Sequence, residues 1–190
     1  MRKIQVLAIL LACIASSALA SPQTSVLPTA QSRQNIAREL AHIFTGLVAD
    51  MRLRQSGNAV EAYASAFHWR VMPEETKMLL NAKSGYVGKV NGQLVMLGSD
   101  GSNDIFSLSV RDHFNPDEVV SELRQVYTLD KRASETSDGQ RFDVYAISDH
   151  GMPVGLVTRS CGIVDAIAGT GTIAFVTLDR TKKDMPDFKG

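Results

Sequence analysis

The dipeptide Asn91-Gly92 separates two short apolar runs, residues 86–90 and 93–97. Asparagine and glycine both tolerate the positive φ angles of a type I′ turn, whose twist matches that of two antiparallel strands. A two-residue connection leaves no room for a crossover helix, so the two runs must be antiparallel neighbours. The pattern therefore predicts a β-hairpin and excludes a purely parallel sheet.

More strand patterns follow this hairpin. Short apolar or alternating segments occur at residues 105–110, 142–146, 152–156, 163–168 and 172–178. A short turn around Asp149-His150-Gly151 joins two of them, which again favours antiparallel pairing. A helix is expected between the first two segments, because Asn115 can cap it and Pro116 suits its first position. We therefore expect a mainly antiparallel sheet with one inserted helix.

The segment before the hairpin has the period of a helix. Its apolar residues lie three and four positions apart and form one stripe, which consists of Ile36, Leu40, Ile43, Phe44, Leu47, Val48 and Met51. His42 lies on the opposite face and is expected to be solvated. Further helices are expected from Asn58 and from Pro73. Helices that precede an antiparallel sheet predict an α+β fold.

Length and composition favour a single globular domain. The chain has 190 residues, of which 44% are hydrophobic and 21% charged, a balance that excludes intrinsic disorder and a disulfide-dense mini-protein. We expect one α+β domain over residues 32–178. A flexible polar leader is expected over residues 21–31 and a loose charged tail over residues 179–190.

Residues 1–20 have the three parts of a secretory signal peptide. Arg2 and Lys3 precede an apolar run, and Ala18-Leu19-Ala20 is a small-x-small cleavage site. The apolar run is shorter than the roughly 20 residues that span a membrane. We therefore expect export to the periplasm or the exterior. A membrane anchor, or lipoprotein processing at Cys13, are the alternatives.

Net charge argues against nucleic acid as a partner. Removal of residues 1–20 would leave 18 basic and 20 acidic residues, a net charge of −2. The basic footprint of a nucleic-acid-binding protein is therefore not expected. No second apolar run approaches the length of a membrane span. We expect a soluble product without a stable membrane span after cleavage.

Cys161 is a weak candidate for a catalytic nucleophile. A reactive thiol needs a lowered pKa and a nearby base. If residues 140–147 and 152–159 form a hairpin, His150 lies at its tip, roughly 30 Å from Cys161 at ~3.3 Å per residue. We therefore expect a structural thiol at a strand end. A thiol-dependent hydrolase or transferase that uses Cys161 is the alternative.

We expect neither a metal nor another cofactor. The four histidines, at positions 42, 68, 113 and 150, contain no i, i+4 pair and no metalloprotease motif. The loop over residues 100–104 has oxygen ligands but lacks the ligand pattern of a calcium loop. Its composition predicts a polar turn.

Trp69, with its neighbours His68 and Arg70, is the candidate site for contact with a ligand or partner. If residues 59–71 formed one helix, Trp69 would point away from the core stripe. An exposed tryptophan beside an arginine is typical of a contact hot spot. The alternative is that Trp69 is buried, because residues 67–71 also alternate like a strand.

The sequence contains no convergent set of catalytic residues. We therefore expect an exported, non-catalytic domain that binds a protein or small ligand in the cell envelope, although an enzyme remains open through Cys161. A second alternative is an accessory subunit of a secretion or surface assembly, which a large exposed apolar patch would favour.

Overall fold

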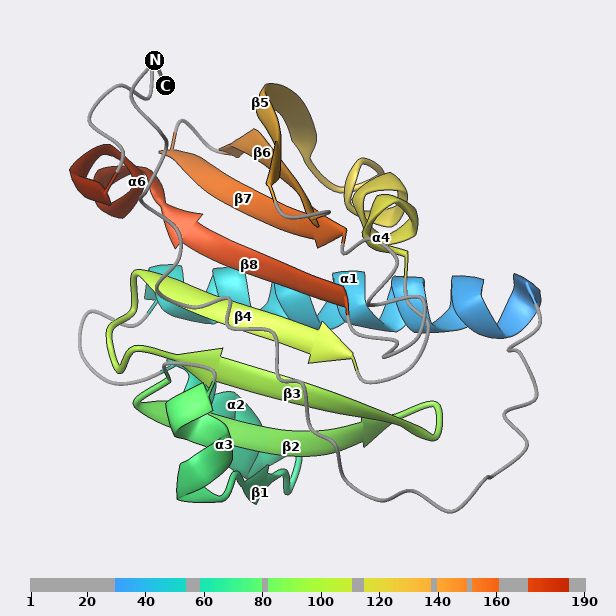
Figure 1. Cartoon of the computed structure of the whole chain (residues 1–190), viewed down its shortest axis with the longest axis vertical. Coiled ribbons are helices and arrows are strands. Elements are labelled where there is room, and N and C mark those ends of the chain that lie inside the picture. Colours follow the sequence, from blue (N-terminus) through green and yellow to red (C-terminus); the bar gives the residue numbers. More distant parts are fainter. Residues whose placement is uncertain are drawn as a thin grey trace.

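The fold is an eight-stranded sheet with helices on its two faces (Figure 1). The structure is a computed structural model, and it describes residues 30–53, 59–79, 82–110, 115–137, 140–149, 152–160 and 171–184. Every strand pairing in the sheet is antiparallel. Among the described residues, two helices precede the first strand, two lie between strands and one follows the last strand, so the predicted α+β class is confirmed.

The strand order across the sheet is β1-β2-β3-β4-β8-β7-β6-β5. The strands are β1 Arg70–Val71, β2 Ser84–Val90, β3 Gln93–Ser99, β4 Ile105–Val110, β5 Thr128–Ser137, β6 Gln140–Asp149, β7 Met152–Ser160 and β8 Gly171–Thr177. The last strand along the chain, β8, lies between β4 and β7. It therefore joins two groups of strands, β1–β4 and β5–β7, that precede it in the sequence.

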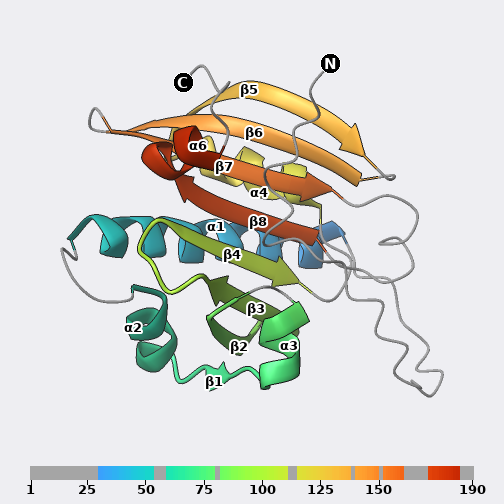
Figure 2. The same cartoon turned by 60° about the vertical axis from the view of Figure 1, so that its left-hand side comes forward.

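Helices α1 (Ala30–Leu53), α2 (Ala59–Ala66) and α4 (Pro116–Leu123) cover one face of the sheet, which we call the helix face. Figure 2 shows α1 and α4 behind the strands, with the short helices α3 (Glu74–Leu79) and α6 (Leu178–Asp184) on the near side. We call the near side the outer face. The inserted helix predicted after Asn115 is α4.

The main core lies between α1 and the centre of the sheet. Phe44 of α1 meets Phe106 of β4 and Phe175 of β8 edge-on, with ring centroids 5.4 and 6.0 Å apart. The predicted stripe of α1 is buried except for Met51, which is half-buried, whereas His42 is exposed. The predicted faces of this helix are therefore confirmed.

Two local predictions are confirmed in detail. Asn91 and Gly92 have φ angles of 49° and 80°, and they join β2 to β3 as a two-residue turn. The side-chain Oδ1 of Asn115 accepts a hydrogen bond from the backbone N–H of Asp117 at 3.0 Å, which is the N-cap contact expected for α4. The hairpin between β6 and β7 is also formed, since Asp149 pairs with Met152.

Three features differ from the sequence-based expectations. The second helix ends at Ala66, and Arg70 and Val71 form a strand instead. Strand β5 was not predicted, because its sequence is mostly polar and charged. The segment expected to be a loose tail contains helix α6, which Thr181 holds against Gly155 of β7. The strand expected over residues 163–168 lies outside the described residues.

Candidate functional site

Exposed apolar side chains gather at one end of the sheet, around β1. In the described part of the chain, the exposed large hydrophobic residues are Phe67, Val71, Met78 and Val126, with 60%, 67%, 78% and 62% of their surface exposed. Three of these four lie within residues 67–78. Single exposed apolar residues are normal on a protein surface, but a group of them marks a contact surface. We call residues 67–71 the β1 edge.

The β1 edge begins at the C-terminus of α2, where His68 occupies a position that is usually glycine. The N–H of Trp69 donates to the carbonyl of Ala64 at 2.8 Å, and the N–H of His68 donates to that of Ser65 at 3.2 Å. These two bonds form a Schellman motif, in which the residue at the position of His68 needs a positive φ angle. The φ angle of His68 is 54°, in a region where glycine is usual.

His68 is therefore held in a conformation that is costly for a residue with a Cβ atom. Its side chain is exposed. Strain of this kind is concentrated at functional sites, because elsewhere a glycine relieves it. The conformation turns the chain sharply from α2 into β1 and leaves the side chains of Phe67, His68 and Arg70 exposed.

Trp69 does not point away from the core, which corrects the expectation based on a continuous helix. It is half-buried and packs against the main core. A Cβ atom placed on Gly88 of β2 would overlap the indole atoms Cε2, Cδ2 and Nε1. The indole therefore lies flat on the glycine and fixes the β1 edge to the helix face of the sheet. The exposed contact groups are its neighbours instead.

Tyr63 of α2 forms the base of this edge. Its ring lies 4.5 Å from that of Phe67 and 6.0 Å from that of Trp69, in an edge-to-face arrangement with the indole. Burial, together with the nearby Glu39 carboxylate, raises the pKa of Tyr63 to about 12. The phenol therefore stays neutral at physiological pH. Its ring packs against the ring of Phe67, which is otherwise exposed to solvent.

A second group of polar residues lies near the other end of the sheet, under α4. Asp143 of β6 is buried, and its Oδ1 accepts from Ser134 Oγ at 2.5 Å and from Lys131 Nζ at 2.7 Å. Its Oδ2 lies 3.1 Å from Nε of Arg141. Nη2 of Arg141 also donates to both carboxylate oxygens of Asp117 of α4, at 2.8 and 2.7 Å. The group ties α4 to β5 and β6.

Asp143 makes the stability of this region dependent on pH. Burial alone would raise the pKa of Asp143, but the bonds from Lys131 and Ser134 and the charge of Arg141 hold it below its usual value. A carboxyl group with a lowered pKa stabilises the fold at neutral pH, and this contribution is lost as the pH falls below about 4.

We expect Asp143→Asn to lower the free energy of unfolding by about 1.5–3 kcal/mol at pH 7, the usual range for hydrogen bonds to a charged group. Because wild-type Asp143 becomes protonated in acid, the difference should shrink as the pH approaches 3. Urea denaturation of both proteins across this range measures it. A difference that is constant with pH would contradict this role of the carboxylate.

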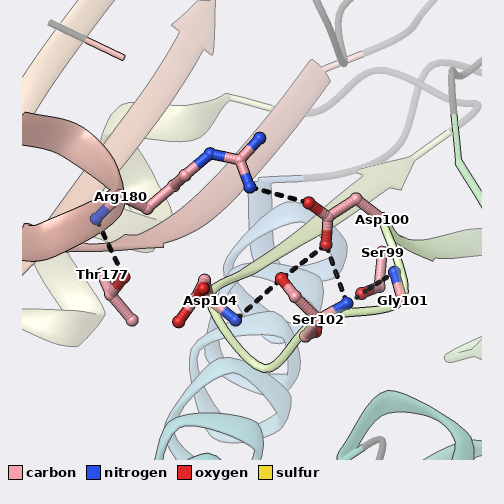
Figure 3. A network of polar contacts seen from close by, with 7 residues as sticks. All are labelled: Ser99, Asp100, Gly101, Ser102, Asp104, Thr177 and Arg180. Atoms are coloured by element: carbon pink, nitrogen blue, oxygen red, sulfur yellow. Dashed lines mark hydrogen bonds and ion pairs between the residues drawn. The ribbon is translucent and has the colours of Figure 1, made fainter. Parts of the chain in front are cut away.

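The loop between β3 and β4 is also held by polar contacts (Figure 3). Asp100 Oδ1 accepts from the backbone and the hydroxyl of Ser102 at 2.9 and 2.6 Å, and its Oδ2 accepts from Arg180 of α6 at 2.9 Å. Asn103 Oδ1 accepts from the N–H of Ala59 and so caps α2. These are the contacts of a polar turn, as predicted, and they tie α6 to the loop.

Several residues singled out in the sequence lie outside the part of the chain that the structure describes. Cys161, His113, His150 and Cys13 lie outside the described residues, as do the signal segment and the leader up to residue 29. In the part of the chain that the structure describes, no three His, Cys, Asp or Glu side chains are grouped as metal ligands. No helix of that part is long and apolar enough to cross a membrane.

Comparison with known proteins gives no relative for this fold. No protein-family model, curated protein or solved structure matches the chain. Functional inference therefore depends on the residues themselves.

The contact residues that sequence analysis missed are Phe67 and Val71. For Val71 the signal was present in the alternation of residues 69–71, which places Trp69 and Val71 on one side of an extended segment, whereas Phe67 lies in the turn that ends α2. The helical interpretation of the same residues drew attention to Trp69 with its neighbours His68 and Arg70 instead. Arg141 and Asp143 gave no recognisable pattern, because their partners come from other strands and from α4.

Proposed function

We propose that this chain is an exported, non-catalytic domain that binds a protein partner in the cell envelope through the β1 edge. Export is proposed from the pattern of residues 1–20. Binding is proposed from one observation above all. Phe67 and Val71, two of the four exposed large hydrophobic residues in the described chain, lie in the β1 edge, and a third, Met78, lies in the neighbouring helix α3.

Two further observations support a contact role for the β1 edge. His68 has a positive φ angle at a position where glycine would be less strained. Its side chain is exposed at the protein surface. Trp69 and Tyr63 fix the segment to the core, so the exposed groups are presented on a rigid base. Preorganised apolar anchors beside an arginine are typical of contact hot spots.

The two carboxylates Asp143 and Asp100 have structural partners. Asp143 joins β5 and β6 through Lys131, and Asp100 joins the β3–β4 loop to α6 through Arg180. This favours a binding role over catalysis for the part that the structure describes. The thiol-dependent alternative rests on Cys161 and stays a hypothesis. The accessory-subunit alternative would use the same apolar patch, so a stable partner would favour it.

The proposal is tested by photo-crosslinking in the exporting cell. A photoreactive phenylalanine analogue at Phe67 should give a discrete protein adduct, because that side chain lies in the contact. The same analogue at Val126 is the matched control, since the two side chains are almost equally exposed, at 60% and 62%. Adducts at both positions, or at neither, would contradict a specific contact at the β1 edge.

A further inference from the structure

We infer that the β1 edge receives an extended segment of its partner, in which apolar and acidic side chains alternate. This inference rests on the proposed function and names the chemistry of the partner. It follows from the free hydrogen-bonding groups of β1 and from the different residues on its two sides.

Within the described residues, the backbone groups of β1 without a sheet partner belong to Val71. Arg70 pairs with Val87 of β2 and Val71 pairs with Tyr86, while the N–H of Met72 donates to the carbonyl of Gly85 at 2.9 Å. In an antiparallel ladder, hydrogen-bonded pairs alternate with pairs that are not hydrogen-bonded. Val71 is in a pair of the second kind, so its N–H and C=O point away from β2. An added strand would bond to these two groups.

The ladder available to a partner is short. The N–H of Trp69 is already donated to Ala64, and Pro73 has no N–H to offer. Two backbone hydrogen bonds contribute only about 1–3 kcal/mol in total. Side-chain contacts must therefore supply most of the affinity and all of the specificity.

On the helix side of β1 the available contacts are apolar. Val71 and Phe67 are largely exposed there, and Tyr86, the register partner of Val71, is packed against the main core. A partner side chain that points to this side would meet the surfaces of Val71 and Phe67. An apolar side chain is the best match, because it removes both surfaces from water.

On the outer face the available contacts are cationic. Arg70 and its partner Val87 share this face, and Lys89, two residues further along β2, shares it too. Arg70 and Lys89 are both exposed, and neither forms an ion pair within the described residues. Helix α3 carries two acids: Glu74 is paired with Lys77, and Glu75 forms no ion pair with Arg70 or Lys89 within the described residues. A carboxylate on the partner would lie beside Arg70, with the charge of Lys89 one strand further away in β2.

An extended segment beside β1 would place successive side chains on opposite faces. One set of side chains would face Phe67 and Val71, and the other set would face Arg70 and Lys89. The partner that satisfies both faces therefore alternates apolar and acidic residues over a short stretch. Charge complementarity selects this segment over a basic or wholly apolar one.

The test uses a phage-displayed library of random linear peptides, selected on the purified protein. We expect enriched peptides with alternating apolar and acidic residues. Charge reversal at both Arg70→Glu and Lys89→Glu should raise their Kd about tenfold or more, because attraction becomes repulsion. The matched control reverses two exposed lysines of α6, Lys182→Glu and Lys183→Glu, and should change Kd by less than about twofold.

A backbone variant tests strand addition separately. Val71→Pro removes the outward N–H but leaves the ladder to β2, since the Val71 N–H takes no part in it. It should weaken peptide binding more than Val71→Ala, which removes side-chain contacts alone. Circular dichroism and the unfolding midpoint establish that the variants are folded. Equal effects of the two variants would overturn strand addition.

Three other outcomes would overturn the inference. If peptide binding is weakened by Phe67→Ser but not by the charge reversal, the contact surface is correct and the preference for acidic residues is wrong. If neither Phe67→Ser nor the charge reversal changes the Kd of the peptides, the proposed function of the β1 edge is wrong as well. Binding to phosphatidylglycerol vesicles that is lost on charge reversal, without any acidic peptide being selected, would identify a membrane surface instead.

Discussion

Phe44→Ala is expected to lower the free energy of unfolding by about 3–5 kcal/mol, as for other buried phenylalanine truncations. The side chain of Phe44 is fully buried, and its ring contacts both Phe106 and Phe175. These two rings belong to β4 and β8, the strands at the centre of the sheet. The loss would therefore leave a cavity at the point where α1 holds the two groups of strands together.

Denaturant unfolding of wild type and variant measures this effect. His42→Ala is the matched control on the same helix, because His42 lies on the exposed face of α1. Its effect should stay within about 0.5 kcal/mol, as for other surface changes. Similar shifts for the two variants would show that α1 does not contribute to the core as described.

Gly88→Ala is expected to displace Trp69 and to destabilise the protein by about 1–3 kcal/mol, the usual cost of overpacking. The added methyl group would overlap the six-membered and five-membered rings of the indole, which cannot yield without moving. Trp69 is the single tryptophan of the chain, so its fluorescence reports the change directly. We expect emission at longer wavelength in the folded variant, as the indole becomes more solvated.

Gly46→Ala is the control for this substitution. A Cβ atom at Gly46 meets only Tyr63 Cε2, at 4.0 Å, and alanine favours a helix over glycine by about 0.5–1 kcal/mol. Gly46→Ala should therefore stabilise the protein and leave the emission unchanged. Adding Trp69→Ala to Gly88→Ala should cost less than the two single effects combined, since the clash is then absent. Strict additivity would contradict the contact.

The features that sequence analysis predicted well depend on neighbouring residues. The positive φ angles of Asn91 and Gly92 are a property of those residue types, and the cap of α4 needs only Asn115 and Asp117. The stripe of α1 follows from helical spacing alone. Each of these signals lies within a few residues, so tertiary contacts were not needed to interpret it.

The remainder of the fold depends on contacts between distant residues. Strand β5 carries few apolar residues because it is an edge strand, with exposed charges at Asp130 and Arg132 and a bulge between Lys131 and Ala133. The position of β8 beside β4 is a choice among several possible partners. Nothing in the sequence of residues 171–177 specifies it.

The candidate site shows the same division. His68 and Arg70 were selected as contact residues, and both are exposed in the structure. The orientation of Trp69 could not be predicted, because it is decided by Gly88, a residue of β2 without a side chain. The pairing of β1 with β2 also decides which faces Arg70 and Lys89 share, and this register is not visible in residues 67–71.

The central position of β8 has a consequence for how the chain reaches its native state. Strands β1 to β4 and strands β5 to β7 are joined into one sheet only when residues 171–177 pair with β4 on one side and β7 on the other. A chain in which residues 171–177 are still held in a ribosome therefore lacks the strand that closes its sheet. Contacts between residues so far apart slow folding. The topology thus leaves the two groups of strands apart until residues 171–177 are free to pair with both.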